Sequence, residues 1–427
     1  MTRRPEPVTI LAPESFRRAL SRRSFLQLGT AAAGVAFLAA CGSSDDDSSP
    51  GTTGGSTAES TGSSAPAGSS ASVPAGSILG NYSNVINKSS GTLAMYTWGD
   101  YNDPEIVGAQ AESALSVSMK VDYYASNEDL ITKLSASNGT SGYDIVVPTG
   151  PFIPQMIEKG LIQKFDLTML PNMVNVDPLY LARAWDPGNE YSVCKDWGST
   201  GWMWNNAVLN RDIATWNDFI EVSMGDASGN VSVLDSANNV TGMYYWANGI
   251  NWTTEETADI DACEVFLVDE YASHIKAFDS YPSTKIAEGA YTLSMAWNGD
   301  ARQAFVRIAD AGGDPEEWKW ALGAPATELW MDNYVIPTGA PNVEAAHAWI
   351  NWLLTPEISI QDLNYHGYNS GMKDMEALLA ELLPDIVDGD MIFFGDEQVA
   401  TMQTGAVNSA QDRTVDILNK VKAKAGG

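Results

Sequence analysis

Short apolar segments alternate with amphipathic ones from about residue 91 to the C-terminus, and this alternation limits the fold more than any other feature. Strands separated by helices predict an α/β architecture built in layers. No long proline- or serine-rich linker divides residues 91–427, so two lobes would have to be joined through short ordered strands. Strands are expected at Leu93–Trp98, Tyr143–Val147, Leu293–Trp297 and Tyr334–Ile336, and helices at Glu128–Ser137, Trp216–Val222 and Val343–Leu354.

The N-terminus carries the features of an export signal. Basic residues precede an uncharged apolar run, Phe25–Ala40, which is shorter than the roughly 20 residues that a membrane span needs. The string at Ser21–Leu26 is similar to a twin-arginine signal, and Leu38–Cys41 resembles a lipoprotein cleavage box. Residues 1–40 are therefore interpreted as the signal, with Cys41 as the lipidation site. Residues 41–77 are rich in Ser, Gly, Ala and Thr and are expected to form a flexible tether.

The charge balance limits the possible partners. The formal net charge is −30, which makes nucleic acid and anionic membrane surfaces poor partners and a cationic ligand plausible. Acidity alone would also keep an extracellular protein in solution. No second apolar run of membrane-spanning length follows the first, so we expect a protein that is anchored by lipid rather than embedded in the bilayer.

Signatures of enzymes and of metal sites are missing from the sequence. Three histidines are present, but no HExxH or CxxC pair, no GxSxG elbow and no glycine-rich phosphate loop followed by lysine. We therefore expect no metal, no cofactor and no catalysis. An exported carbohydrate hydrolase that uses two carboxylates, such as Asp300 and Asp332, stays open as the alternative of a different class.

Aromatic residues stand beside acids where predicted strands end. In α/β proteins the carboxyl ends of strands are the usual place for ligands. An indole face attracts a cation, and a carboxylate adds a directional charge-assisted bond. Buried tryptophans and turn aspartates would give the same spacing without any ligand. The groups are Trp98 with Asp100 and Tyr101, Trp297 with Asp300, and Trp330 with Asp332.

Several strings, in order, resemble the bacterial spermidine/putrescine-binding proteins, which are solute receptors of ABC importers. The most specific are Thr92–Pro104 (TLAMYTWGDYNDP) and Asp186–Val193 (DPGNEYSV). Shorter matches occur at Ser141–Thr149, Met295–Asp300 and Trp330–Pro337. The resemblance covers nearly all of residues 91–370.

The resemblance implies a two-lobed periplasmic-binding-protein fold with a hinged cleft that closes on its ligand. By analogy with the family, one lobe would comprise residues 78–203 plus 299–340, and the other 204–298 plus 341–427. It also implies a monomer that delivers a polyamine to the permease subunits of an importer. The ligand-binding residues carried over from the family are Trp98, Asp100, Tyr101, Thr149, Asp235, Trp297, Asp300, Trp330, Asp332 and Tyr368, with Tyr365 as an alternative to Tyr368.

The chain departs from the family pattern around residues 232–240. Asp235 is present, but Ser236 and Asn239 stand where relatives often have acids. The ligand is therefore expected to be shorter or less charged than spermidine, and a receptor for another small cation or zwitterion, such as agmatine, stays open. Cys194 and Cys263 fit either a disulfide, which export permits, or two separate buried thiols.

Overall fold

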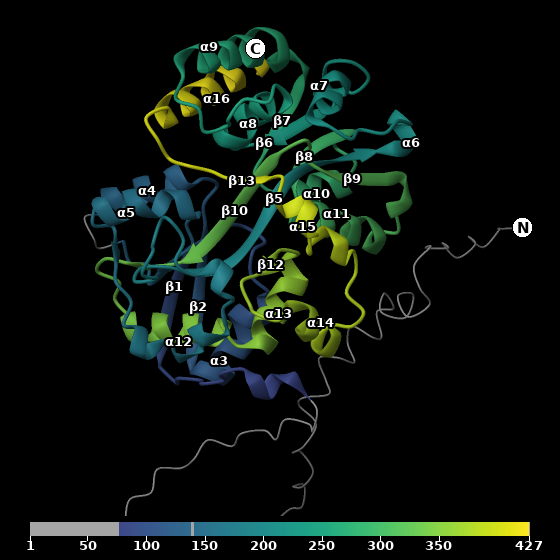
Figure 1. The fold of residues 1–427 in the computed structure, drawn as a ribbon. Helices are drawn as coiled ribbons and strands as arrows, with labels where there is room; N and C mark the ends of the chain where they lie inside the picture. Colours follow the sequence, from purple (N-terminus) through teal and green to yellow (C-terminus); the bar gives the residue numbers. More distant parts are fainter. Residues whose placement is uncertain (1–76, 138–140, 427) are drawn as a thin grey trace, which may run out of the picture. The chain divides into compact units, whose positions relative to one another are not determined.

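The computed structural model describes residues 77–137 and 141–426, whose strands form two main β-sheets and one small one (Figure 1). A three-stranded sheet has the order β2-β1-β3, and a larger mixed sheet has the order β13-β10-β5-β8-β6-β7. We call the body around β1–β3 the first lobe and the body around β6–β8 the second lobe. The predicted export signal, Cys41 and nearly all of the predicted tether lie outside the described residues.

The first lobe is built on the parallel strands β1 (Gly91–Thr97), β2 (Val117–Tyr123) and β3 (Ile145–Val146). Alternate residues of β1, Leu93 and Met95, are fully buried and share a core with Trp349 of helix α12. This is the alternation that a strand needs in order to bury one face. The other elements of this lobe are α3 (Ala111–Leu115), α4 (Asn127–Ala136), α5 (Ile153–Glu158), β4 (Ile162–Gln163), β11 (Ile336–Pro337), α12 (Val343–Leu353), α13 (Pro356–His366) and α14 (Met375–Leu382).

The second lobe contains the parallel strands β8 (Leu293–Trp297), β6 (Val231–Leu234) and β7 (Ile275–Asp279). All of β6 is buried, because helices cover both faces of the sheet. The C-terminal helix α16 packs beside α8, far along the sequence from it (Figure 1). The helices of this lobe are α6 (Asn206–Leu209), α7 (Trp216–Met224), α8 (Ala237–Ala247), α9 (Thr257–Val265), α10 (Pro282–Ala287), α11 (Asn298–Asp310) and α16 (Gln411–Ala425).

Two long antiparallel strands, β5 (Val193–Asn205) and β10 (Thr327–Tyr334), connect the lobes (Figure 1). The first half of β5 pairs with β10, and the second half pairs with β8 and with β9 (Trp318–Leu322). The expected crossing through ordered strands is therefore present. The short elements beside these strands are β12 (Asn369–Ser370), α15 (Asp396–Val399) and β13 (Met402–Thr404).

The sequence located most of these elements well. Leu293–Trp297 matches β8 along its whole length, and α7 begins with Thr215 as its N-cap in a capping box with Asp218. Ser126 caps α4. The segment Tyr334–Ile336 was predicted as one strand but spans the end of β10 and the start of β11.

The core contacts group two helices differently from the expected lobe boundaries. Helix α11 was expected in the first lobe, but its Ala301 and Ala304 pack with Ala296 of β8. Helix α12 was expected in the second lobe, but its Trp349 packs with Met95 of β1. The physical reason is connectivity: α11 continues directly from β8, whereas β10 carries the chain back to the first lobe before α12 begins. The chain returns to the second lobe with α16.

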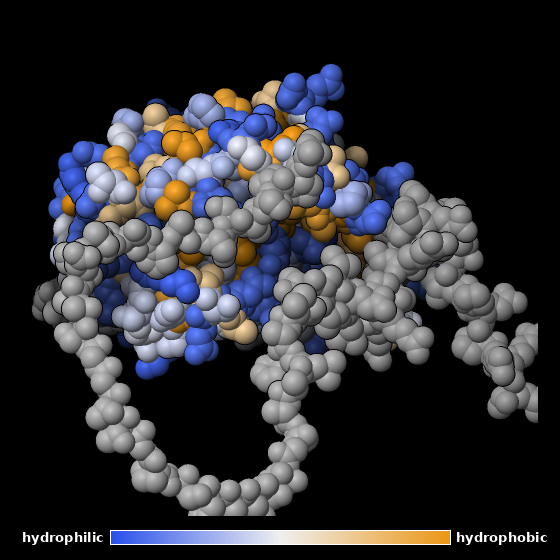
Figure 2. Space-filling model, turned by 90° about the horizontal axis from the view of Figure 1, so that it is seen from below, coloured by the Kyte–Doolittle hydropathy of each residue, from blue (hydrophilic) through white to orange (hydrophobic). Residues whose placement is uncertain are grey.

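On the face shown in Figure 2, hydrophobic residues are scattered among hydrophilic ones, as is common for protein surfaces in water. In the part of the chain that the structure describes, no helix combines the length and apolarity required to cross a bilayer. Cys194 and Cys263 are both buried as free thiols, so the disulfide interpretation is not supported.

Candidate functional site: a cleft lined by aromatic residues and acids

A cleft of about 370 Å³ receives side chains from both lobes and from the connecting strands. Its size suits a small organic molecule. The structure brings together all ten residues that the sequence singled out, since each of them lines this cleft: Trp98, Asp100, Tyr101, Thr149, Asp235, Trp297, Asp300, Trp330, Asp332 and Tyr368.

Strand β10 supplies one wall of the cleft. Glu328, Trp330 and Asp332 alternate along β10, and side chains two apart on a strand point to the same face. The indole of Trp330 lies directly against Gly198 of β5, where a Cβ atom would come within 2.5 Å of the ring. Glycine at position 198 is therefore what allows the aromatic wall to seat against the neighbouring strand.

Asp332 is the most deeply placed acid of the cleft. Its Oδ2 lies 2.8 Å from the hydroxyl of Tyr101, and its Oδ1 is buried and accepts no hydrogen bond of good geometry among the described residues, although the nearby Thr149 hydroxyl lowers the pKa of the carboxyl somewhat. Burial, and next the nearby Asp196, raise the pKa of the Asp332 carboxyl to about 8. A buried carboxylate oxygen without a donor is unfavourable, so this atom points to a donor or cation that a ligand would supply.

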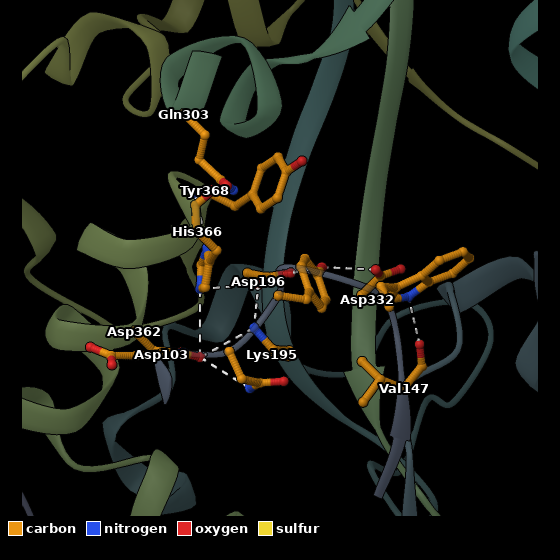
Figure 3. Close-up of polar contacts among 12 residues, drawn as sticks. Asp103, Val147, Lys195, Asp196, Gln303, Asp332, Asp362, His366 and Tyr368 are labelled. Atoms are coloured by element: carbon orange, nitrogen blue, oxygen red, sulfur yellow. Dashed lines mark hydrogen bonds and ion pairs between the residues drawn. The ribbon is translucent and has the colours of Figure 1, made fainter. Parts of the chain in front are cut away.

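A buried group of charges lies beneath Asp332 (Figure 3). The ammonium of Lys195 contacts Asp196 at 2.8 Å and Asp362 at 3.2 Å, and His366 lies 3.3 Å from Asp196. Burial holds the pKa of His366 well below its usual range, so the ring is neutral. The single ammonium of Lys195 is thus shared by two buried acids, Asp196 and Asp362, and burial raises the pKa of both carboxyls.

The Tyr101 hydroxyl connects this group to the cleft. It contacts both Asp196 and Asp332 but can donate only one hydrogen bond. Asp196 is paired with Lys195, so it is the carboxylate that accepts the tyrosine proton. Asp332 must then be protonated and donate to the tyrosine oxygen in the empty cleft.

A second acid, Asp300, stands in the first turn of α11. Tyr368 donates a hydrogen bond to it at 2.6 Å, and burial raises the pKa of the Asp300 carboxyl to about 7. The ring of Tyr368 also packs edge-on against Trp330, with 4.8 Å between the ring centroids. The aromatic wall and the acid are therefore held as one unit.

The first lobe contributes Trp98 and Thr149 in fixed orientations. The indole N–H of Trp98 donates to the carbonyl of Val147 at 2.9 Å, and its ring packs against Tyr124 while lining the cleft. The Thr149 hydroxyl accepts a hydrogen bond from the Asn127 amide at 3.0 Å. Trp297, from the second lobe, ends β8 and begins α11.

Contacts between the lobes close the mouth of the cleft. Arg307 of α11 forms an ion pair of 3.0 Å with Asp100. The hydroxyl of Tyr281 donates to the carbonyl of Tyr124 at 2.7 Å, and Gln411 donates to Glu128 at 3.0 Å. The cleft is therefore described in a closed arrangement, and Asp100 is already engaged by a cation of the protein.

Asp235 and Glu328 form the end of the cleft in the second lobe. Asp235 is ion-paired with Lys422 of α16. Glu328 accepts hydrogen bonds from Asn239 at 2.7 Å and from Thr200 at 3.3 Å, and burial raises the pKa of its carboxyl to about 7.

Sequence reasoning missed Glu328, Glu128 and Lys422. The two-residue period along β10 would have found Glu328, because it precedes Trp330 and Asp332 by two and four residues. Glu128 lay inside a string noted for its resemblance, but it was not considered a cleft residue. Lys422 reaches the cleft from the last helix of the chain, and no local pattern could have indicated this.

The arrangement can bind a cation, and nothing in it performs chemistry on one. Indoles and buried carboxyls surround the space, and no group of metal-binding side chains occurs among the described residues. The hydrolase alternative placed Asp300 and Asp332 as a catalytic pair. Both are instead hydrogen-bonded to tyrosines, an arrangement that suits fixed ligand contacts.

Known proteins share both the sequence and the fold. The spermidine/putrescine-binding periplasmic protein of Escherichia coli strain K12 is 32% identical over 281 residues, which is 65% of this chain and 76% of that protein. The putrescine/agmatine-binding protein of Pseudomonas aeruginosa is 28% identical over 323 residues, covering 73% and 86%. The TpPotD lipoprotein structure of Treponema pallidum superposes with a TM-score of 0.66 at 26% identity, covering 77% of this chain and 99% of that one.

These matches agree with the α/β architecture, the two lobes and the cleft between them. Residues 107–382 match the family described as bacterial extracellular solute-binding protein. The proteins found are binding proteins rather than hydrolases. The chain belongs to the bacterial extracellular solute-binding protein family, within its polyamine-binding branch.

Proposed function

We propose that this protein is an exported receptor that captures a small polyamine and delivers it to the permease of an ABC importer. The observation that carries the proposal is the buried, unpartnered Oδ1 of Asp332 in a cleft walled by Trp98, Trp297 and Trp330. An ammonium group would supply the missing donor, and the indoles would pack the methylene chain and attract the charge. The names of the relatives, which bind spermidine, putrescine or agmatine, support the same ligand class.

The cleft residues predicted from the sequence are proposed as the ligand contacts, except Asp235, which is ion-paired with Lys422. Asp300 and Asp332 would accept hydrogen bonds from ammonium groups, because both are buried and face the same space. The aromatic residues would exclude water from around the ligand. Closure through Arg307–Asp100 and Tyr281–Tyr124 would retain the ligand once it is bound.

We also propose that the protein is held at the outer face of the cytoplasmic membrane through a lipid on Cys41. The support is the sequence: arginines, an apolar run and a small-residue box end at Cys41, and a polar tether follows. A twin-arginine route is proposed from Ser21–Leu26. One chain contains the whole cleft, so the receptor is proposed to act as a monomer.

Thermal unfolding against a ligand panel tests the function. The panel contains putrescine, agmatine, spermidine, glutamate and maltose. A ligand that binds only the folded protein stabilises it by about 2.7 kcal/mol at a hundredfold excess over Kd. We expect a rise of the midpoint with one or more amines and none with maltose.

Two variants sharpen this test. Asp332→Asn should remove the shift, whereas Asp310→Asn should keep it, because Asp310 is exposed and lies on α11 away from the cleft lining. A shift with maltose or glutamate alone would overturn the polyamine proposal.

A further inference from the structure

One face of the C-terminal helix α16 forms part of the cleft. Val415, Leu418, Asn419 and Lys422 line it, and their spacing places them on the same side of a helix. Lys422 is the one basic side chain among the described residues that line the cleft. A positive charge inside an otherwise acidic cleft requires an explanation.

The ammonium of Lys422 is held in place. It forms an ion pair with Asp235, which follows β6, and it lies 5.7 Å from the centroid of the Phe278 ring. The helix is anchored by Arg413 and Lys420, which both contact Glu264 at 2.7 Å. The side chains of Lys422 and Asp235 are 36% and 30% exposed, so the pair is partly shielded from solvent.

The ion pair removes a binding site for a ligand ammonium. Asp235 has its charge compensated by Lys422, and the nearby Ser236 and Asn239 are neutral. Glu328 already receives hydrogen bonds from Asn239 and Thr200. Near the opposite end, Asp300 and Asp332 are paired with no cation of the described chain, and each has a tyrosine hydroxyl as its hydrogen-bond partner.

We propose that Lys422 determines ligand length: its ammonium occupies Asp235 in place of a ligand amine, so that the cleft selects a short amine over a triamine. This inference rests on the proposed function, since it concerns which polyamine the same cleft accepts. A ligand with a third ammonium would bring that charge near Lys422 and would find no free carboxylate at Asp235. A short diamine avoids this repulsion because its charges are satisfied by Asp300 and Asp332.

The test compares Lys422→Met with Lys424→Met by calorimetric titration of the full chain with putrescine and spermidine. Methionine keeps the apolar stem and removes the charge, and Lys424 is an exposed residue of the same helix outside the cleft lining. We expect Lys422→Met to raise the affinity for spermidine at least tenfold while the affinity for putrescine changes less than threefold. Lys424→Met should match the unchanged protein for both ligands.

A second variant tests whether the freed Asp235 carboxylate is the cause of the gain. In Lys422→Met/Asp235→Asn the freed carboxylate is absent, so the gain for spermidine should disappear. If the unchanged protein binds an amine but Lys422→Met leaves the ratio of the two affinities within threefold, the inference is overturned and the proposed function stands. If no variant binds either amine, both are overturned.

Discussion

Raising the pH should strengthen polyamine binding, because the ligand has to displace a proton from Asp332. The Tyr101 hydroxyl donates to Asp196, which is paired with Lys195, so Asp332 carries the proton before a ligand binds. An arriving ammonium binds the ionised form. The pKa of the Asp332 carboxyl is about 8 before binding, and the cation lowers it.

The size of the effect follows from that pKa. Below it, the ionised fraction falls about tenfold for each pH unit, so at pH 6 about one Asp332 in a hundred is ready to bind. Affinity should therefore fall roughly 100-fold, or about 2.7 kcal/mol, between pH 8.5 and pH 6. At pH 7 Asp332 should release about 0.9 of a proton on binding. Asp300, whose carboxyl pKa is about 7, would add up to about half a proton at that pH and would steepen the dependence below it.

Calorimetric titration in buffers of different ionisation enthalpy measures both quantities. The apparent binding enthalpy should change linearly with the buffer's ionisation enthalpy, with a slope of about 0.9 to 1.4 protons at pH 7. The control Asp310→Asn should give the same slope. An affinity that stays constant from pH 6 to pH 8.5, or a slope near zero at pH 7, would refute the assignment of the proton to Asp332.

Three further outcomes follow from the site. Asp332→Asn should stabilise the ligand-free protein at pH 8. A carboxyl with a raised pKa contributes stability below about pH 4 that is lost as the pH rises through about 8, and asparagine does not titrate. Equal melting temperatures of the variant and the unchanged protein at pH 8 would contradict this prediction. Trp330→Ala should lower the free energy of unfolding by about 3–5 kcal/mol, because it removes a buried ring that packs on Tyr368 and Gly198. Urea titration measures this loss, and a loss well below about 3 kcal/mol would contradict the prediction. Arg307→Ala breaks the contact with Asp100 between the lobes, so it should raise the dissociation rate constant of the ligand several-fold and change the association rate constant little. Stopped-flow experiments measure both rate constants, and a change in the association rate constant alone would contradict the prediction.

The sequence predicted the architecture because its signals are local. Strand β8 and the capped helix α7 are defined by neighbouring residues, so their bounds were predicted well. The aromatic and acidic pairs were found for the same reason: each lies within a few residues along the chain, near a strand end. The resemblance placed Asp235 and Tyr368 in the same cleft, which spacing alone could not do.

The features that were missed depend on segments far apart in the sequence. Asp235 was predicted as an ammonium contact, but its partner Lys422 comes from the last helix. The lobe assignment of α11 and α12 depends on where β10 leads the chain. Lys195 and Asp196 lie in a fully buried part of β5, where no local pattern explains charged residues, and Lys195 also pairs with Asp362 of the distant helix α13.

Strand β10 and helix α16 both line the cleft, but only β10 also connects the lobes. Strand β10 both connects the lobes and presents Glu328, Trp330 and Asp332 to the cleft, so changes there alter ligand contact and lobe motion together. Helix α16 reaches the same cleft without belonging to the connecting strands, so its cleft-facing residues can be exchanged to change the ligand contacts while the pairing of β5 with β10 is left intact.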